Sequence, residues 1–196
     1  MARTRHGGLR VIAGSAGGLT LVAPKGGPAR PTTDRVKESL FAALGPDRIM
    51  DASVLDLYAG SGALAIEALS RGATRAVLVE RDHAAVTAIR RNLATTRLGE
   101  QARVQDSTVA TFLGGKPPAE RPFDLVLADP PYAATAPELG RVLGGLDRTG
   151  WLAESATVVV ERPSEAVAIP APESWETTWE RAYGDTLVTV FTTPTG

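Results

Sequence analysis

The pattern of apolar and polar positions indicates short strands alternating with helices. Apolar runs bounded by glycine, proline or charged residues predict strands, and these runs lie at 54–57, 76–80, 102–106, 123–128 and 156–161. The intervening segments are typical of helices, at 63–71, from the N-cap Asp82 to about Arg97, briefly before residue 114, and at 136–146. Because helices that connect parallel strands cover both faces of the sheet, this alternation predicts an α/β domain.

The two ends of the chain have patterns of their own. Residues 177–183 and 186–192 are β-prone and are separated by Gly184-Asp185, which is typical of an antiparallel hairpin. Near the N-terminus, the runs 9–13 and 19–22 flank a glycine-rich loop and predict a second hairpin. A helix is expected from Pro31 to about Leu44, and its predicted apolar positions are Val36, Leu40, Ala43 and Leu44.

Together these elements predict one domain with an N-terminal extension. Residues 1–30 are expected to form a β-hairpin arm that binds RNA, and residues 31–196 a catalytic domain. The expected fold class is α/β, with a Rossmann-like seven-stranded, mostly parallel sheet. Helices should cover both faces of that sheet, and an antiparallel strand pair should complete it at the C-terminus.

Composition narrows the chemistry. Of the 196 residues, 43% are hydrophobic and 22% charged, which is ordinary for a globular protein. The chain has no cysteine, which excludes a disulfide scaffold, a cysteine zinc site, an iron–sulfur cluster and a cysteine nucleophile. It has only two histidines, so no metal site is expected. No apolar run approaches the roughly 18 residues that a membrane helix needs, and we expect a cytoplasmic protein without membrane contact.

The net charge of −1 conceals an uneven distribution. Residues 1–37 carry seven basic side chains against one acidic side chain, whereas the rest of the chain carries fourteen basic and twenty-one acidic side chains. The balance is therefore +6 in the first segment and −7 in the second. Such an asymmetry indicates a polyanionic partner for the N-terminal segment, although a solvated basic leader would give the same count.

A glycine-containing turn follows the first strand of the alternating region. Gly60 and Gly62 allow positive φ angles and let a ligand approach the backbone. Glu80, at the end of the next strand, is placed to accept hydrogen bonds from two ribose hydroxyls. Asp106, followed by Ser107, ends the third strand and can accept from an adenine amino group. The pattern predicts an adenosine-containing ligand, and these residues alone do not separate a dinucleotide from other adenosine ligands.

Asp56, four residues before the first glycine, does discriminate between these ligands. An acidic group at this position would repel the pyrophosphate of a dinucleotide. It suits a ligand that carries a cationic sulfonium and an ammonium group, which describes S-adenosylmethionine. Asp56 could also cap the glycine turn, and both roles can hold together.

A second motif, Asp129-Pro130-Pro131-Tyr132, follows the fourth strand directly. The two prolines stiffen the backbone and lack N–H donors, so exposed carbonyls and the Asp129 carboxylate form an array of acceptors. This array fits an exocyclic amino group of a base, because it can accept hydrogen bonds from both N–H groups of the amine. Tyr132 offers a flat face on which a flipped base can stack. The alternative is a strand-end turn with a packed tyrosine.

The chain resembles class I S-adenosylmethionine-dependent amino-methyltransferases, and in particular the RsmD family. The cofactor motif is Asp56-x-Tyr58-x-Gly60-x-Gly62, and the catalytic motif is Asp129-Pro130-Pro131-Tyr132. Further similarity covers residues 30–41, 55–64, 67–73 and 183–186. Tyr58 stands where the family more usually has phenylalanine.

The resemblance implies a substrate and a set of site residues. The family methylates the N2 amino group of one guanine in 16S ribosomal RNA, so we expect a monomer that acts on a partly or fully assembled small ribosomal subunit. S-adenosylmethionine is converted to S-adenosylhomocysteine without a metal. The residues expected to act on the base are Asp129, Pro130 and Tyr132. The residues expected to bind the cofactor are Asp56, Tyr58, Gly60, Gly62, Glu80, Asp106 and Ser107. Those expected to contact RNA are Arg10, Arg30, Arg35 and Lys37.

Other functions remain open at this point. A DNA adenine or cytosine amino-methyltransferase would use the same two motifs, but the loops after the fourth and fifth strands are short for a target-recognition region. A glutamine-N5 methyltransferase normally has asparagine where Asp129 stands. A dinucleotide-dependent dehydrogenase would need a hydride-transfer constellation that the sequence does not show. A non-catalytic protein that binds adenosine ligands or RNA would retain its function after Asp129→Ala.

Overall fold

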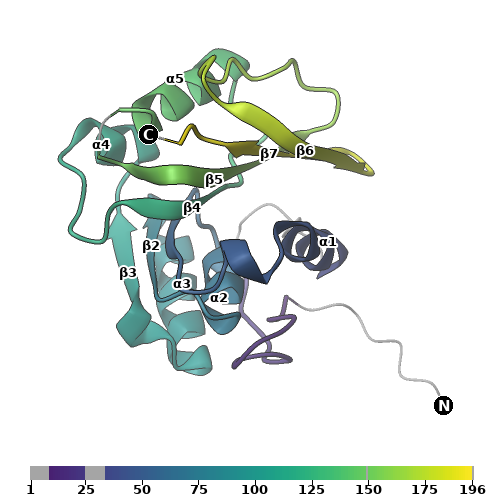
Figure 1. Ribbon diagram of the computed structural model, residues 1–196. Coiled ribbons are helices and arrows are strands. Elements are labelled where there is room, and N and C mark those ends of the chain that lie inside the picture. Colours follow the sequence, from purple (N-terminus) through teal and green to yellow (C-terminus); the bar gives the residue numbers. More distant parts are fainter. Residues whose placement is uncertain (1–8, 25–33, 149, 196) are drawn as a thin grey trace.

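A computed structural model describes residues 9–24, 34–148 and 150–195. Its centre is a seven-stranded sheet in the order β3-β2-β1-β4-β5-β7-β6 (Figure 1). The strands are β1 (Ser53–Leu57), β2 (Arg75–Glu80), β3 (Ala102–Asp106), β4 (Phe123–Ala128), β5 (Leu152–Pro163), β6 (Glu176–Tyr183) and β7 (Thr186–Thr192). The helices are α1 (Asp34–Leu44), α2 (Ala63–Ser70), α3 (His83–Thr96), α4 (Val109–Gly114) and α5 (Ala136–Leu146), with short 3₁₀ turns at Pro46–Arg48 and Gly99–Gln101.

The predicted sheet is confirmed. Strands β1 to β5 pair in parallel, and β7 runs antiparallel to both β5 and β6. The strand β5 begins earlier than expected, at Leu152 rather than at Ala156. The chain passes from the edge strand β3 across to β4, so β1 lies between β2 and β4 where the direction of winding changes. Ligands bind at the carboxyl ends of the strands at such a point.

Helices cover both faces of the sheet, which accounts for the strongly apolar strands. Figure 1 shows α1, α2 and α3 on one side of the sheet and α4 and α5 on the other. Each side has its own buried apolar cluster, one built around Ile66 and Leu78 and the other around Leu57 and Leu143. Trp151 and Trp175 belong to the second cluster and pack rather than face solvent. The rigid centre of the molecule therefore fixes the strand ends that carry the predicted motifs.

The predicted N-terminal hairpin is present, but it is shorter than the two runs that predict it. Its described part, residues 9–24, has a single antiparallel bridge between Arg10 and Thr20. The N–H groups of Ile12 and Ala13 donate instead to the buried carboxylate of Glu67 on α2, at 2.7 and 3.1 Å. Its loop contacts the end of α2, where the N–H of Ser15 donates to the carbonyl of Ser70 at 2.8 Å. Within the arm, the N–H groups of Val11 and Leu21 donate to the carbonyls of Leu19 and Leu9 at 2.9 and 2.7 Å. The arm is thus a short hairpin that α2 holds through its side chains and backbone.

Helix α1 packs through a somewhat different face from the one predicted. Val36, Leu40 and Leu44 are buried as expected, whereas Ala43 is exposed. Phe41 and Lys37 occupy the buried stripe instead. Positions 37, 40, 41 and 44 follow the three- and four-residue spacing of one helix face, and position 43 lies outside it.

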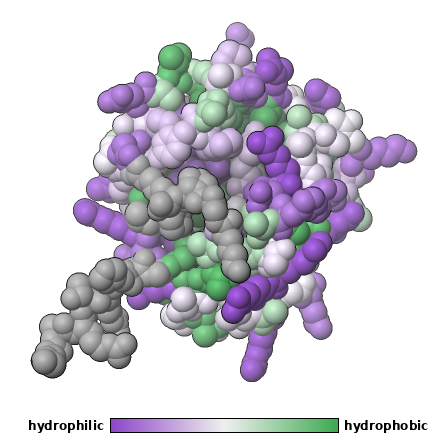
Figure 2. Space-filling model, turned by 180° about the vertical axis from the view of Figure 1, so that it is seen from behind, coloured by the Kyte–Doolittle hydropathy of each residue, from purple (hydrophilic) through white to green (hydrophobic). Residues whose placement is uncertain are grey.

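Large hydrophobic side chains are rarely exposed on the surface. On the face shown in Figure 2, hydrophilic side chains project outward and hydrophobic residues form small separate areas. Among the described residues the exposed large hydrophobic side chains are Leu19, Met50, Tyr132 and Val167. Within the same residues, no helix is long and apolar enough to cross a membrane.

Candidate active site

The two predicted motifs lie next to each other at the carboxyl ends of β1 and β4. These strands are parallel neighbours, with Leu57 paired to Ala128. The N–H of Asp129 donates to the carbonyl of Leu57 at 3.4 Å, so the turn after β4 starts beside the turn after β1. A ligand bound over the glycine turn would therefore lie close to the Asp-Pro-Pro-Tyr turn.

The glycine turn has the backbone conformation that its sequence predicts. Gly60 and Gly62 have φ angles of 55° and 76°, and Tyr58 between β1 and the glycines also has a positive φ of 61°. A Cβ at Gly62 would lie 3.0 Å from Leu78 Cδ2, so this glycine allows α2 to pack on β2. At Gly60 the nearest atom to a built Cβ is a backbone oxygen 3.9 Å away, which leaves open space beside the turn. Gly60 therefore provides the place where a ligand can approach the backbone.

The acids that end β2 and β3 lie opposite each other beside this turn. Glu80 and Asp106 are register partners on parallel strands. The Glu80 carboxylate accepts from the N–H of Gly60 at 2.9 Å and from two further N–H groups in its own turn. Asp106 Oδ2 lies 3.2 Å from His83 Nδ1, and the N–H of Ser107 donates to the Glu80 carbonyl at 3.0 Å. Glu80 thus joins all three strand ends while remaining partly exposed.

Asp56 is buried directly beneath the turn. Its Oδ2 accepts from the N–H of Ala65 in the first turn of α2 at 3.1 Å, a contact that replaces the side-chain cap missing at the N-cap Gly62. Burial, with a smaller effect of the negative charges of Asp129 and Glu80, raises the pKa of Asp56 to about 8 against the lowering effect of the Ala65 N–H. The capping role is therefore present, and the local field favours a cation.

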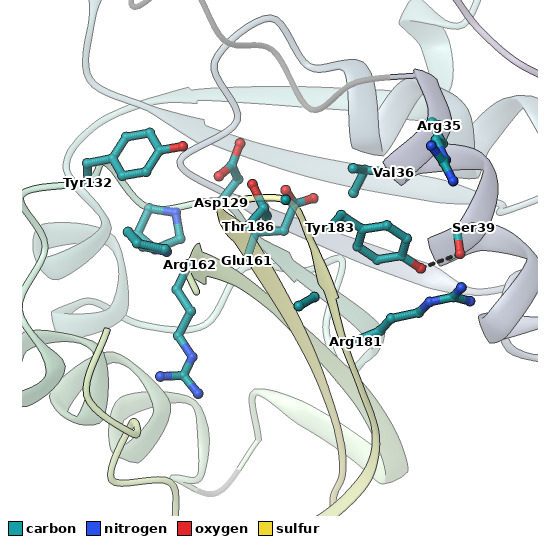
Figure 3. Close-up of a pocket in the computed structure, with 14 residues that line it drawn as sticks. Arg35, Val36, Ser39, Asp129, Tyr132, Glu161, Arg162, Arg181, Tyr183 and Thr186 are labelled. Carbon is teal, nitrogen blue, oxygen red and sulfur yellow. Dashed lines mark hydrogen bonds between the residues drawn. The ribbon is translucent and has the colours of Figure 1, made fainter. Parts of the chain in front are cut away.

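The Asp-Pro-Pro-Tyr turn forms one wall of a cavity of about 410 Å³. Asp129 is exposed and Tyr132 is 57% exposed, so the carboxylate and the ring are both accessible. The opposite walls come from α1 and from the β6–β7 hairpin, whose Tyr183 hydroxyl hydrogen-bonds with Ser39 on α1 (Figure 3). The cavity brings Asp129, Pro130 and Tyr132 together as predicted.

Several residues of this cavity were not expected from the sequence. Glu161, near the end of β5, lines the cavity together with Thr186 and Arg181. Figure 3 shows Asp129, Thr186 and Glu161 close together between the rings of Tyr132 and Tyr183. The position of Glu161 near the end of a strand could have indicated this role. Val160 on β5 pairs with Ala128 on β4, and the next residues in the chain are Glu161 and Asp129.

The predicted RNA contacts separate into different groups. Arg35 lines the cavity and is exposed. Arg10 is also exposed, and its Nε lies 2.7 Å from Asp34 Oδ2. Arg30 lies outside the described residues.

Lys37 is fully buried, and this contradicts its predicted contact with RNA phosphate. Its ammonium group donates to the carbonyl of Arg10 and lies 3.7 Å from Asp34 Oδ1. Burial lowers the pKa of Lys37, against the raising effect of Glu67 and Asp34. Residues two apart on a helix lie about 200° apart around its axis, so Arg35 and Lys37 cannot share one exposed face.

The donor set of the site suits an organic cation better than a metal. The carboxyl group of Asp56 lies beneath the glycine turn, the carboxylate of Glu80 lies beside it, and open space lies beside Gly60. Among the residues that the structure describes, no group of three or more His, Cys, Asp or Glu side chains could hold a metal ion. The residues present fit S-adenosylmethionine, with backbone at the glycine turn, a carboxylate for its ribose and negative charge near its cationic groups.

Comparison with known proteins identifies relatives over nearly the whole chain. Residues 9–192 match the family model described as conserved hypothetical protein 95. Ribosomal RNA small subunit methyltransferase D of Escherichia coli K12 is 40% identical over 187 residues, covering 94% of this chain and 91% of the relative. The protein of the same name from Haemophilus influenzae is 37% identical over 180 residues, covering 91% of this chain and 90% of the relative.

Solved structures agree with this relationship. The yhhF protein of Escherichia coli superposes with a TM-score of 0.83 at 37% sequence identity, covering 95% of this chain and 98% of that chain. A hypothetical protein of Thermus thermophilus superposes with a TM-score of 0.75 at 32% identity, covering 92% of this chain and 97% of that chain. The family match over residues 9–192 spans both the glycine turn and the residues that line the cavity beside it.

Proposed function

The chain belongs to the conserved hypothetical protein 95 family, which is the RsmD family that its sequence resembles, and we propose on that premise that it methylates small-subunit ribosomal RNA. The methyl group comes from S-adenosylmethionine, and the acceptor is the N2 amino group of one guanine. The names of the relatives support methyl transfer as the reaction and small-subunit ribosomal RNA as the substrate.

The observation that carries this proposal is the adjacency of the two turns. The glycine turn after β1 and the Asp129 turn after β4 are joined by the hydrogen bond from Asp129 N–H to the Leu57 carbonyl. The glycine turn fits a cationic adenosine-containing ligand, and the Asp129 turn can accept hydrogen bonds from an amino group. Their adjacency allows both reactants to lie within attack distance, which is the main contribution an enzyme makes to such a displacement.

The reaction is a direct displacement at the methyl carbon. S-adenosylmethionine supplies an electrophilic methyl group and leaves as the neutral thioether S-adenosylhomocysteine. The lone pair of guanine N2 forms the new N–C bond as the S–C bond breaks, and N2 then loses one proton. Asp129 and the Pro130 carbonyl orient the amine by accepting hydrogen bonds from its two N–H groups, and Asp129 is placed to receive the released proton. Tyr132 stacks on the base and keeps it in plane.

The cationic side chains at the mouth of the cavity support a nucleic-acid substrate. Arg35 on α1 and Arg181 on β6 line the cavity from two sides, and the Arg181 guanidinium lies 5.3 Å from the centre of the Tyr183 ring. Both residues are exposed, so they are placed to contact phosphates on either side of a flipped nucleotide. We expect the acceptor to be presented by a partly or fully assembled small subunit.

The proposal is tested by labelling. Purified protein and tritiated S-adenosylmethionine are incubated with small ribosomal subunits from a strain that lacks the corresponding gene, and the RNA is digested to nucleosides. We expect label in N2-methylguanosine from the small-subunit RNA. Parallel reactions contain naked 16S RNA and genomic DNA. Label in adenosine, in cytosine of DNA, or in no nucleoside would contradict the proposal.

A further inference from the structure

The acceptor array of the Asp129 turn does not by itself select among bases. Guanine, adenine and cytosine each have an exocyclic amino group that Asp129 and Pro130 could hold. A protein that modifies only guanine needs a second group that reads another atom on the same edge of the base. The cavity offers such a group at the end of the neighbouring strand.

Glu161 lies beside Asp129 because of strand register. Ala128 at the end of β4 pairs with Val160 on β5; Asp129 follows directly after β4, and Glu161 is the next residue of β5. Because neighbouring strands are roughly 4.8 Å apart, side chains at these two positions can converge on adjacent atoms of one base. Figure 3 shows both side chains with Thr186 in the middle of the cavity.

The burial of Glu161 is unusual for a glutamate. Only 3% of its surface is exposed, although it lines a cavity that is open enough to admit a base. Carboxylates are rarely buried to this degree, because their desolvation costs several kcal/mol. In such surroundings water competes little for the carboxylate oxygens, so an N–H donor that a ligand brings into the cavity forms a strong hydrogen bond.

Guanine alone places a second donor next to its amino group. Its N1 carries a hydrogen beside N2, whereas the ring nitrogen beside the amino group of adenine or cytosine is an acceptor. A second carboxylate next to Asp129 therefore attracts guanine and repels the other two bases. Resting on the proposed function, we propose that Glu161 selects guanine by accepting the N1–H of the target base while Asp129 holds its N2 amino group.

The test compares two acceptor bases that both have an N2 amino group. Small subunits are reconstituted from 16S RNA in which splinted ligation has placed guanine or 2-aminopurine at the target position found by the labelling experiment. The base 2-aminopurine retains the amino group but has an acceptor at N1. We expect the wild-type protein to favour guanine in kcat/KM by at least about a hundredfold. In Glu161→Gln the amide can donate to N1 of 2-aminopurine, so this preference should fall by at least about tenfold.

Controls separate base reading from folding. Glu154→Gln changes an exposed glutamate at the opposite end of β5 and should keep the wild-type preference. Glu161→Asp retains a carboxylate on a shorter side chain and should lower the rate while the preference for guanine persists. Each variant is checked for cofactor affinity and thermal unfolding, and if Glu161→Gln does not fold, the wild type and Glu161→Asp decide the question.

Two outcomes would overturn the inference. The first is equal use of guanine and 2-aminopurine by the wild type. The second is a Glu161→Gln variant that loses activity on both templates by the same factor. If the wild-type protein methylates neither the guanine template nor the 2-aminopurine template, the proposed function itself is contradicted. The two failures are therefore distinguishable.

Discussion

The backbone N–H of Gly60 donates a hydrogen bond to Glu80 Oε2 at 2.9 Å, which joins the glycine turn after β1 to the acid that ends β2. This contact holds the turn open beside a carboxylate that still has exposed surface. The same carboxylate accepts from the N–H groups of Arg81 and Asp82. Glu80 is therefore both a support for the turn and a candidate ligand for ribose hydroxyls.

Replacing Glu80 with alanine should weaken cofactor binding more than it weakens the fold. The variant loses the ribose acceptor and leaves the Gly60 N–H without its partner, so we expect at least about a tenfold rise in Kd for S-adenosylmethionine. The expected loss of unfolding free energy is about 1–2 kcal/mol. Calorimetric titration and urea unfolding measure the two effects, and unchanged affinity would contradict the assigned role.

Substitution by alanine should have different effects at the two glycines of the turn. Gly60→Ala introduces a Cβ into open space at φ 55°, so it should chiefly block the ligand and cost about 1 kcal/mol in stability. Gly62→Ala adds a contact of 3.0 Å with Leu78 Cδ2 at φ 76°, so it should destabilise the fold by about 2 kcal/mol or more. Thermal unfolding and cofactor titration of both variants check the contrast. Equal effects of the two substitutions on both measurements would show that the turn acts as one unit.

Asp129→Ala should separate binding from transfer. The side chain is exposed in the cavity and lies beyond the end of β4, so the variant should fold and bind S-adenosylmethionine with little change in Kd. Methyl transfer to small subunits should fall by at least about a hundredfold, because the amino group is no longer oriented. Asp129→Asn, which keeps one acceptor oxygen, is the matched control and should retain part of the activity. Loss of cofactor binding in Asp129→Ala would mean that this residue serves the cofactor.

Cofactor affinity should depend on pH through Asp56. With a pKa raised to about 8, Asp56 is mostly protonated at pH 6, and a cationic ligand favours its ionised form. Binding should therefore release a proton, and the affinity should increase with pH toward 8 by at most about tenfold per pH unit. Asp56→Asn cannot ionise and should lack this slope. Calorimetry in buffers of different ionisation enthalpy counts the protons, and an identical slope in the variant would exclude Asp56 as the source.

The raised pKa of Asp56 also determines the direction in which the stability of the fold changes with pH. The folded protein holds the Asp56 proton up to about pH 8, whereas the unfolded chain releases it near its ordinary value of 3.8. Between these values the folded state binds more protons, so this residue's contribution to stability should decline as pH rises and be lowest above pH 8. Urea unfolding of wild type and Asp56→Asn from pH 5 to 8 should show a steeper decline in the wild type. The free protein is the right sample, because bound cofactor would mask the effect.

Lys37 and Arg35 should have opposite phenotypes although they are two residues apart. Lys37→Ala removes a buried ammonium group from the Arg10 carbonyl and from the neighbourhood of Asp34, and should cost about 2–4 kcal/mol of stability. Arg35→Ala should leave stability unchanged, reduce RNA affinity, and lower the salt dependence of binding by roughly one counterion. Unfolding curves and salt titrations of RNA binding test the pair. A Lys37→Ala variant that is fully stable would contradict the buried anchoring role.

The sequence by itself determined the parts of this protein that local pattern controls. Alternating apolar runs and helical segments specify the sheet, because burial on both faces makes the central strands β1, β2 and β4 largely apolar. The positive φ angles at Gly60 and Gly62 and the acids that end β2 and β3 could also be predicted, because turn chemistry and strand ends depend on neighbouring residues. These features were sufficient to place two motifs at one edge of the sheet.

Only the tertiary structure decided which side chains face the cavity and which are buried. Lys37 occupies the core side of α1 because the arm supplies the Arg10 carbonyl from 27 residues away, a partner that helical spacing cannot reveal. The hairpin of the arm is fixed against the domain because Glu67 on α2 accepts from the N–H groups of Ile12 and Ala13, more than 50 residues away in the chain. Glu161 joins Asp129 because β5 pairs with β4 in that register. In each case the partner is distant in sequence, and register and packing bring it into contact.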